Sequence, residues 1–244
     1  MFNIIELSPN VNVTDTGGAL AVSPSAQERI EAIWRQEKAA RGDALYNGRV
    51  FNLTSITPGE ITGFYVDYAA VLAQHRDPDL FNDLNLRPLA VCGIVSLKQG
   101  LIFGLRNDNL TADPGMWELA ASGGVDDSVR GENGAVDFQE QFLGELCEEL
   151  NLPSDAVSAI SAVALLEDLK THVCDLVLDA RLSIGAETLF PLFNECGRDE
   201  YTAIDVIPES GVKGFVQLMK GSVTPASLHI LSHKGYIKLL GSAA

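Results

Sequence analysis

The chain has 244 residues, of which 46% are apolar, 20% charged and 7% aromatic, a composition typical of globular proteins and unlike that of disordered or fibrous chains. Its 33 acidic and 17 basic side chains give a formal net charge of −16. This acidity argues against nucleic acid or an anionic membrane as partner, because both require a basic surface. An anionic substrate is compatible with this net negative charge if a divalent cation between substrate and protein offsets their repulsion.

The cysteines favour a reducing compartment. They are far apart in the chain and form no CxxC pair: Cys92, Cys147, Cys174 and Cys196. The sequence therefore predicts neither a disulfide framework nor a zinc site, and we expect a cytoplasmic protein. No Lys or Arg precedes Arg29, which argues against a signal peptide. The longest apolar run, Leu89–Leu97, is too short to span a bilayer.

Residues 1–86 predict a small α+β region. Short apolar groups alternate with polar ones over residues 1–22, which predicts one or two strands. Ser25 and Glu28 have the spacing of a capping box, and Gly42 suits the end of the helix that they begin. Further along we expect a strand over 48–57, its hairpin partner over 60–67 and a short helix over 68–75.

Residues 87–244 predict a larger α/β domain. Its strongest signal is a helix over 136–150, in which four apolar residues recur at four-residue spacing: Phe138, Phe142, Leu146 and Leu150. A polar loop over 126–134 precedes this helix. We expect strands over 88–97, 100–106, 116–121, 158–167, 172–182 and 201–207, and helices over 187–195, 208–219 and 225–240.

Three carboxylates lie one turn apart on the predicted helix. Glu145, Glu148 and Glu149 stand at positions i, i+3 and i+4, which places them on one helix face. Like charges at this spacing repel, and a divalent cation would offset the cost, because Mg²⁺ prefers carboxylate oxygens together with water and phosphate. A solvated acidic face explains the spacing equally well, so spacing alone leaves both interpretations open.

The stretch before the helix favours a metal site. The sequence PGMWELAASGGVD over residues 114–126 takes a strand into two glycines, and glycine lets backbone approach a metal closely. Together with the three glutamates, this stretch resembles the signature of the Nudix hydrolase family. That signature is a Gly, five residues, a Glu, seven residues, and then Arg-Glu-(apolar)-x-Glu-Glu-x-Gly-(apolar). The resemblance covers roughly residues 87–210.

The chain departs from this signature in three places. Gly144 stands where the family has the Arg that orients the glutamates, and Asn151 stands where it has Gly. The stretch from Gly124 to Gly144 spans twenty positions, whereas the consensus has fourteen. The first glutamate of the signature has no match, and Glu132 in the longer loop is a candidate for it. The loop over 126–136 is either a substrate lid or an exposed insertion.

The resemblance implies an α/β fold, a Nudix α/β/α sandwich with a mixed sheet, and a metal-dependent hydrolase. Its metal, Mg²⁺ or Mn²⁺, would be bound by Glu145, Glu148 and Glu149, and the carbonyl of Gly123 would add a ligand. The resemblance further implies that a carboxylate assists as general base, and the catalytic candidates are Glu145, Glu149 and Glu200. Arg106 either holds phosphate oxygens or is a surface cation at a strand end.

The substrate implied by the resemblance is a nucleoside diphosphate linked to another group. Ile33-Trp34, YNGRVF over 46–51 and GFYVDY over 63–68 look like the N-terminal part of UDP-glucose-hydrolysing Nudix proteins, although each set of aromatics could equally be core. We therefore expect a small-molecule partner, a nucleotide sugar, cleaved to nucleoside monophosphate and sugar phosphate. The resemblance further implies that the chain forms a homodimer.

Two alternatives stay open. The first is a Nudix-fold nucleotide-binding or regulatory domain with weak catalysis, which Gly144 and the longer loop favour. The second is an acidic interaction protein in which the glutamate helix is only a solvated face.

Overall fold

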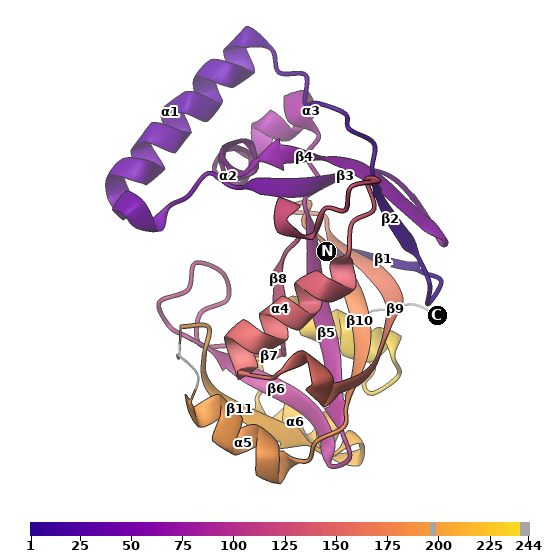
Figure 1. Cartoon of the computed structure of the whole chain (residues 1–244). Coiled ribbons are helices and arrows are strands. Elements are labelled where there is room, and N and C mark those ends of the chain that lie inside the picture. Colours follow the sequence, from indigo (N-terminus) through magenta and orange to yellow (C-terminus); the bar gives the residue numbers. More distant parts are fainter. Residues whose placement is uncertain (196–198, 240–244) are drawn as a thin grey trace.

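The structure is a computed structural model that describes residues 1–195 and 199–239, so Cys196 lies outside the described residues. Within these ranges, an eight-stranded sheet forms the centre of the molecule (Figure 1). Its strands are β1 (Phe2–Glu6), β5 (Leu89–Leu97), β6 (Gly100–Arg106), β7 (Trp117–Leu119), β8 (Ser122–Gly124), β9 (Val157–Asp168), β10 (Cys174–Leu182) and β11 (Tyr201–Ile207). Their order is β1-β9-β10-β5-β6-β11, with β7 beside β6 and β8 beside β5. Because β10 runs parallel to β5 and antiparallel to β9, the sheet is mixed, as predicted.

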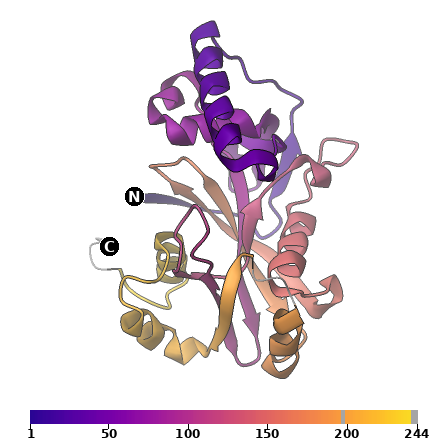
Figure 2. The same ribbon diagram turned by 90° about the vertical axis from the view of Figure 1, so that its left-hand side faces the viewer.

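Helices cover both faces of this sheet (Figure 2). α4 (Phe138–Leu150) and α5 (Ala186–Glu195) pack on one face, and α6 (Val212–Leu218) and α7 (Pro225–His233) pack on the other. The apolar residues at four-residue spacing on α4 are all buried in the core between the sheet and the helices α4 and α5. Gly93 of β5 makes room for them, since a Cβ there would lie 2.2 Å from the ring of Phe142. The predicted three-layer α/β/α architecture is confirmed.

A smaller sheet and three helices form the N-terminal region. The sheet has the order β2-β4-β3. Its strands are β2 (Asn12–Asp15), β3 (Arg49–Thr57) and β4 (Glu60–Asp67), and the helices are α1 (Pro24–Arg41), α2 (Tyr68–Arg76) and α3 (Phe81–Leu84). These helices pack on one face of the small sheet around their own apolar core. The predicted small α+β region is therefore confirmed.

Two details of this region differ from the expectation. The cap of α1 is Ser23, whose side chain accepts a hydrogen bond from the Ala26 amide at 3.2 Å, and not the capping box of Ser25 and Glu28. Pro24 occupies the first helical position, which its fixed φ suits. The boundary between residues 86 and 87 stays a prediction, but β1 hydrogen-bonds with β9 and so belongs to the large sheet.

The loop over residues 126–136 packs against the small sheet. The Val136 amide donates to the carbonyl of Val13 at 2.9 Å, and the Asp15 amide donates to the carbonyl of Gly134 at 2.7 Å. The Arg130 guanidinium lies 2.7 Å from the Asp15 carboxylate. The loop therefore joins β2 to the start of α4. Among the described residues, no helix is both long enough and apolar enough to cross a membrane.

Candidate functional site

The glutamates of α4 lie beside the short strand β8. Glu149 is 7% exposed, and its Oε2 accepts a hydrogen bond from the Ser122 amide at 3.3 Å. Glu145 is half-buried and accepts a hydrogen bond from Gln141 Nε2 at 2.8 Å. Glu148 is exposed. Of these three carboxylates, the helix thus turns Glu145 and Glu149 toward the sheet and leaves Glu148 facing solvent.

The carboxylate of Glu145 lies directly over Gly123. A Cβ atom on residue 123 would be 2.0 Å from Glu145 Oε1 and 2.1 Å from its carboxyl carbon. At the neighbouring Gly124, a Cβ would meet nothing within 4 Å. The absence of a side chain at position 123, and not at 124, is therefore what lets α4 bring this carboxylate against the backbone of β8.

Two further carboxylates meet at Arg106. Glu118 of β7 accepts hydrogen bonds from Arg106 Nη1 at 2.6 Å and from the Tyr201 hydroxyl at 2.8 Å. The same nitrogen of Arg106 lies 2.9 Å from Glu200 Oε1. The side chain of Arg106 is only 11% exposed. Arg106 is thus held between two carboxylates of the chain, and its contact with phosphate stays a prediction.

Sequence reasoning did not single out Glu118 or Tyr201. For Glu118 a signal was present: Trp117 and Leu119 both pack in the core under α7, so alternation along β7 turns Glu118 to the opposite face, where α4 lies. Tyr201 is buried with 1% exposure, and Gly104 makes room for it, because a Cβ there would lie 2.5 Å from the Tyr201 ring. This packing joins distant segments and has no local signal.

Burial raises the pKa of four of the carboxyls at this site: Glu118, Glu145, Glu149 and Glu200. The pKa of Glu145 is raised to about 7, by burial first and then by the charges of Glu148 and other acids, while its hydrogen bond from Gln141 acts in the opposite direction. The pKa of Glu149 is raised to about 9, by burial and then by the charge of Glu200. Ionising this cluster therefore costs free energy, which a bound cation would offset.

The donors suit a hard divalent cation. Such a cation prefers oxygen ligands. Glu145, Glu148 and Glu149 supply carboxylate oxygens, and the backbone of Gly123 lies against the carboxylate of Glu145. Within residues 1–195 and 199–239, no three His, Cys, Asp or Glu side chains already stand close enough together to hold a metal ion. Binding would therefore require these glutamate side chains to turn toward one another.

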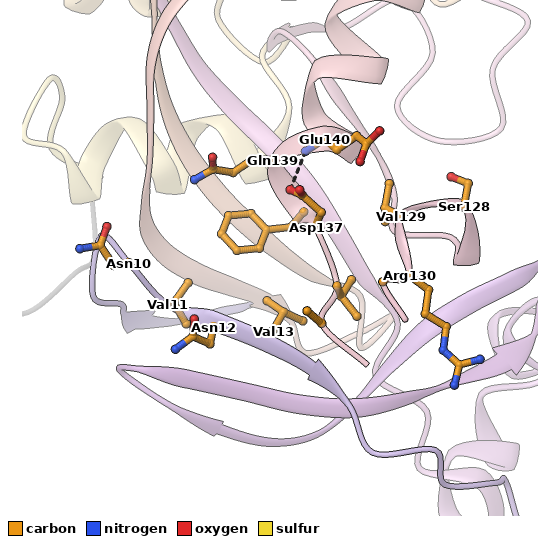
Figure 3. Close-up of a pocket in the computed structure, with 14 residues that line it drawn as sticks. Asn10, Val11, Asn12, Val13, Ser128, Val129, Arg130, Asp137, Gln139 and Glu140 are labelled. Carbon is orange, nitrogen blue, oxygen red and sulfur yellow. Dashed lines mark hydrogen bonds between the residues drawn. The ribbon is translucent and has the colours of Figure 1, made fainter. Parts of the chain in front are cut away.

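A separate pocket of about 540 Å³ lies at the other end of α4 (Figure 3). Asn10 borders it from the segment before β2, Asn12 from the start of β2, and Gln139 and Glu140 from the first turn of α4. Asp137 caps this turn by accepting a hydrogen bond from the Glu140 amide at 3.0 Å (Figure 3). The residues that line the pocket include none of the clustered glutamates.

Comparisons with known proteins give only structural similarity. No protein-family model and no curated protein matches the chain. Among solved structures, DR0079 from Deinococcus radiodurans is 16% identical over 78% of this chain and 99% of its own, with a TM-score of 0.49. The MutT protein from Methanosarcina mazei Go1 is 14% identical over 60% of this chain and 90% of its own, with a TM-score of 0.42. A structure described as "Tm1382, a putative Nudix hydrolase" is 9% identical over 81% of this chain and 96% of its own, with a TM-score of 0.43. Because all three scores are below 0.5, function has to be inferred from the residues of the site.

Proposed function

We propose that the chain is a divalent-cation-dependent hydrolase that cleaves the phosphoanhydride bond of a nucleoside diphosphate linked to another group. A nucleotide sugar is the substrate class that we propose, with nucleoside monophosphate and sugar phosphate as products. The supporting observation is that the charges of Glu200, Glu145 and Glu118 all act on the buried carboxyl of Glu149, while Gly123 lies directly beneath the carboxylate of Glu145. The similarity of residues 114–126 and the α4 glutamates to the Nudix signature supports the same reaction. The expected homodimer stays a prediction.

The metal ligands that we propose lie on α4 and β8. Glu145, Glu148 and Glu149 would hold Mg²⁺ or Mn²⁺, and the carbonyl of Gly123 would add an oxygen. When bound, the metal would neutralise phosphate charge and polarise a phosphoryl oxygen.

Glu200 is our candidate for taking the proton from the attacking water. Its side chain is 28% exposed, so it is accessible to that water, and Arg106 holds its carboxylate at 2.9 Å. Burial raises the pKa of Glu200 and Arg106 lowers it, and a base is most effective when its pKa approaches the working pH.

The test is product release from a panel of substrates with Mg²⁺. The panel contains nucleotide sugars, ADP-ribose, dinucleotides and nucleoside triphosphates. Glu149→Gln is the test variant, and Glu140→Gln, an exposed carboxylate on the first turn of the same helix, is the matched control. Turnover of one class that is lost in Glu149→Gln and kept in Glu140→Gln supports the proposal. Equal turnover by both variants contradicts it.

A second function is nucleotide binding without efficient hydrolysis. Gly144 favours it, because glycine has no side chain that could orient the neighbouring glutamates. Mg²⁺-dependent binding of a nucleotide by a wild-type protein that turns over no member of the panel would support this second function. We also propose a cytoplasmic setting, supported by the free thiols of Cys92, Cys147 and Cys174.

A further inference from the structure

Gln141 makes hydrogen bonds with both ends of its side-chain amide. Its Nε2 donates to Glu145 Oε1 at 2.8 Å, one turn further along α4. Its Oε1 accepts a hydrogen bond from the backbone amide of Asp126 at 3.3 Å. An ordinary helix pair at this spacing uses only the first of these contacts and contributes a few tenths of a kcal/mol. The second contact ties the same amide to a different segment of the chain.

That segment is fixed by both sheets. The Phe51 amide of β3 donates to the carbonyl of Val125 at 2.9 Å, and the Val125 amide donates to the carbonyl of Leu89 in β5 at 3.0 Å. Asp126 itself forms a β-bridge with Val50 of β3. The backbone amide that holds Gln141 is therefore held in turn by the small sheet on one side and by the large sheet on the other.

Glu145 depends on this contact for its orientation. Gln141 is the hydrogen-bond partner of its carboxylate among the described residues. On the side of β8 the carboxylate lies over Gly123, which has no side chain to hold it. The preceding residue, Gly144, has none either. A carboxylate on a flexible chain loses less rotamer entropy at the moment of reaction when a fixed donor already restrains it.

We propose that Gln141 is a positioning residue, through which the N-terminal sheet and the loop after β8 set the place of the Glu145 carboxylate. Its consequence for turnover rests on the proposed hydrolase function. The long loop and the N-terminal region thereby gain a role in the site that neither reaches directly. Gln141 acts through Glu145 and itself touches no reacting atom.

The kinetic test compares Gln141→Ala, Gln141→Asn and Gln141→Lys with Gln139→Ala as the matched control on the same helix. A hydrogen bond to a charged group corresponds to a factor of about ten to a hundred. We expect Gln141→Ala and Gln141→Asn, whose side chains do not reach Glu145, to lose that factor in kcat with KM and Tm close to wild type. Gln141→Lys keeps a donor to Glu145 but loses the acceptor of the Asp126 amide, so it should recover little of the loss. A wild-type kcat in Gln141→Ala or in Gln141→Lys overturns the proposal.

A second measurement is independent of turnover, so that it separates this proposal from the proposed function. In the NMR spectrum of the wild-type protein, the Nε2 signals of Gln141, assigned by their loss in Gln141→Ala, should include one proton shifted downfield and protected from exchange with water. The shift should disappear in Glu145→Ala and persist in Glu140→Ala. Signals at the position of a solvated amide in the wild-type protein, or a shift that survives in Glu145→Ala, contradict the proposal whether or not the protein hydrolyses any substrate.

Discussion

Adding a single methyl group at position 123 should disable the site without unfolding the protein. In Gly123→Ala, the new Cβ would lie 2.0 Å from Glu145 Oε1, whereas ordinary contacts begin at 3.4 Å. The carboxylate therefore has to move by about 1.4 Å, the difference between these two distances. Because the obstacle is the end of a flexible side chain, the backbone of β8 can stay in place.

The cost follows from what the displaced carboxylate loses. Its hydrogen bond from Gln141 is 2.8 Å long, and a movement of this size away from Nε2 carries it beyond hydrogen-bond distance. Loss of a hydrogen bond to a charged group costs about 1.5–3 kcal/mol, and a displacement of about 1 Å can reduce turnover a hundredfold. We expect kcat to fall by about ten- to a hundredfold.

Gly124→Ala is the matched control, because the same methyl group on the next residue of β8 would meet nothing within 4 Å. The assay is kcat on the best substrate of the panel, together with the free energy of unfolding in urea. Gly123→Ala should lose activity with an unfolding free energy within about 1 kcal/mol of wild type, while Gly124→Ala should keep both. A Gly123→Ala protein with wild-type kcat, or equal losses in both variants, would refute the inference that Glu145 must lie over Gly123.

Three further predictions concern stability. Gly144→Ala should stabilise the protein by about 1 kcal/mol in urea unfolding, because position 144 is exposed inside a helix with nothing within 4 Å of a Cβ; a destabilised variant would contradict the open space. Glu167→Ala should cost about 2–3 kcal/mol, since it leaves Arg87 without the carboxylate 2.6 Å from its Nη2. Asp67→Ala breaks an exposed pair with Arg49 and should cost under about 1 kcal/mol. Equal losses of unfolding free energy in Glu167→Ala and Asp67→Ala would show that burial does not set the strength of these two ion pairs. Burial raises the pKa of Asp175 to about 7 from an ordinary value of 3.8. Between these values the folded state holds a proton that the unfolded state releases, so this contribution to stability is complete below pH 3.8 and is lost as the pH rises to 7. Asp175→Asn should flatten that part of the stability profile, and an unchanged profile would show that Asp175 is not its cause.

Local signals in the sequence predicted most of the elements. The four-residue spacing from Phe138 to Leu150 predicted α4 because one face of this helix packs on the large sheet. The hairpin of β3 and β4 was predicted over 48–57 and 60–67, and the two strands pair from Arg49↔Asp67 to Thr57↔Glu60. Patterns of this kind carry over to structure because burial on one face imposes the same period on sequence and fold.

Contacts between distant segments could not be predicted in this way. Arg106, Glu118 and Tyr201 come from three strands, and their meeting depends on the order β11-β6-β7 in the sheet. The alternation in β1 indicates a strand but not its partner, which is β9 in the large sheet. The pairing of residues 134–136 with β2 joins two loop-like stretches with no pattern of their own. The sequence therefore predicted the glutamates of α4 as candidates but did not predict the groups that contact them.

The N-terminal region is more than an appended module, because it hydrogen-bonds to segments that border the candidate site. β3 hydrogen-bonds through Phe51 to the segment after β8, and through Leu53 to the carbonyl of Arg87, which leads into β5. β1 completes one edge of the large sheet. A chain that began at residue 87 would lack this edge strand and expose the backbone groups that β3 now pairs, and unpaired buried backbone groups are costly. Since Gln141 is held by the same segment, one set of hydrogen bonds links the N-terminal sheet to the carboxylate of Glu145.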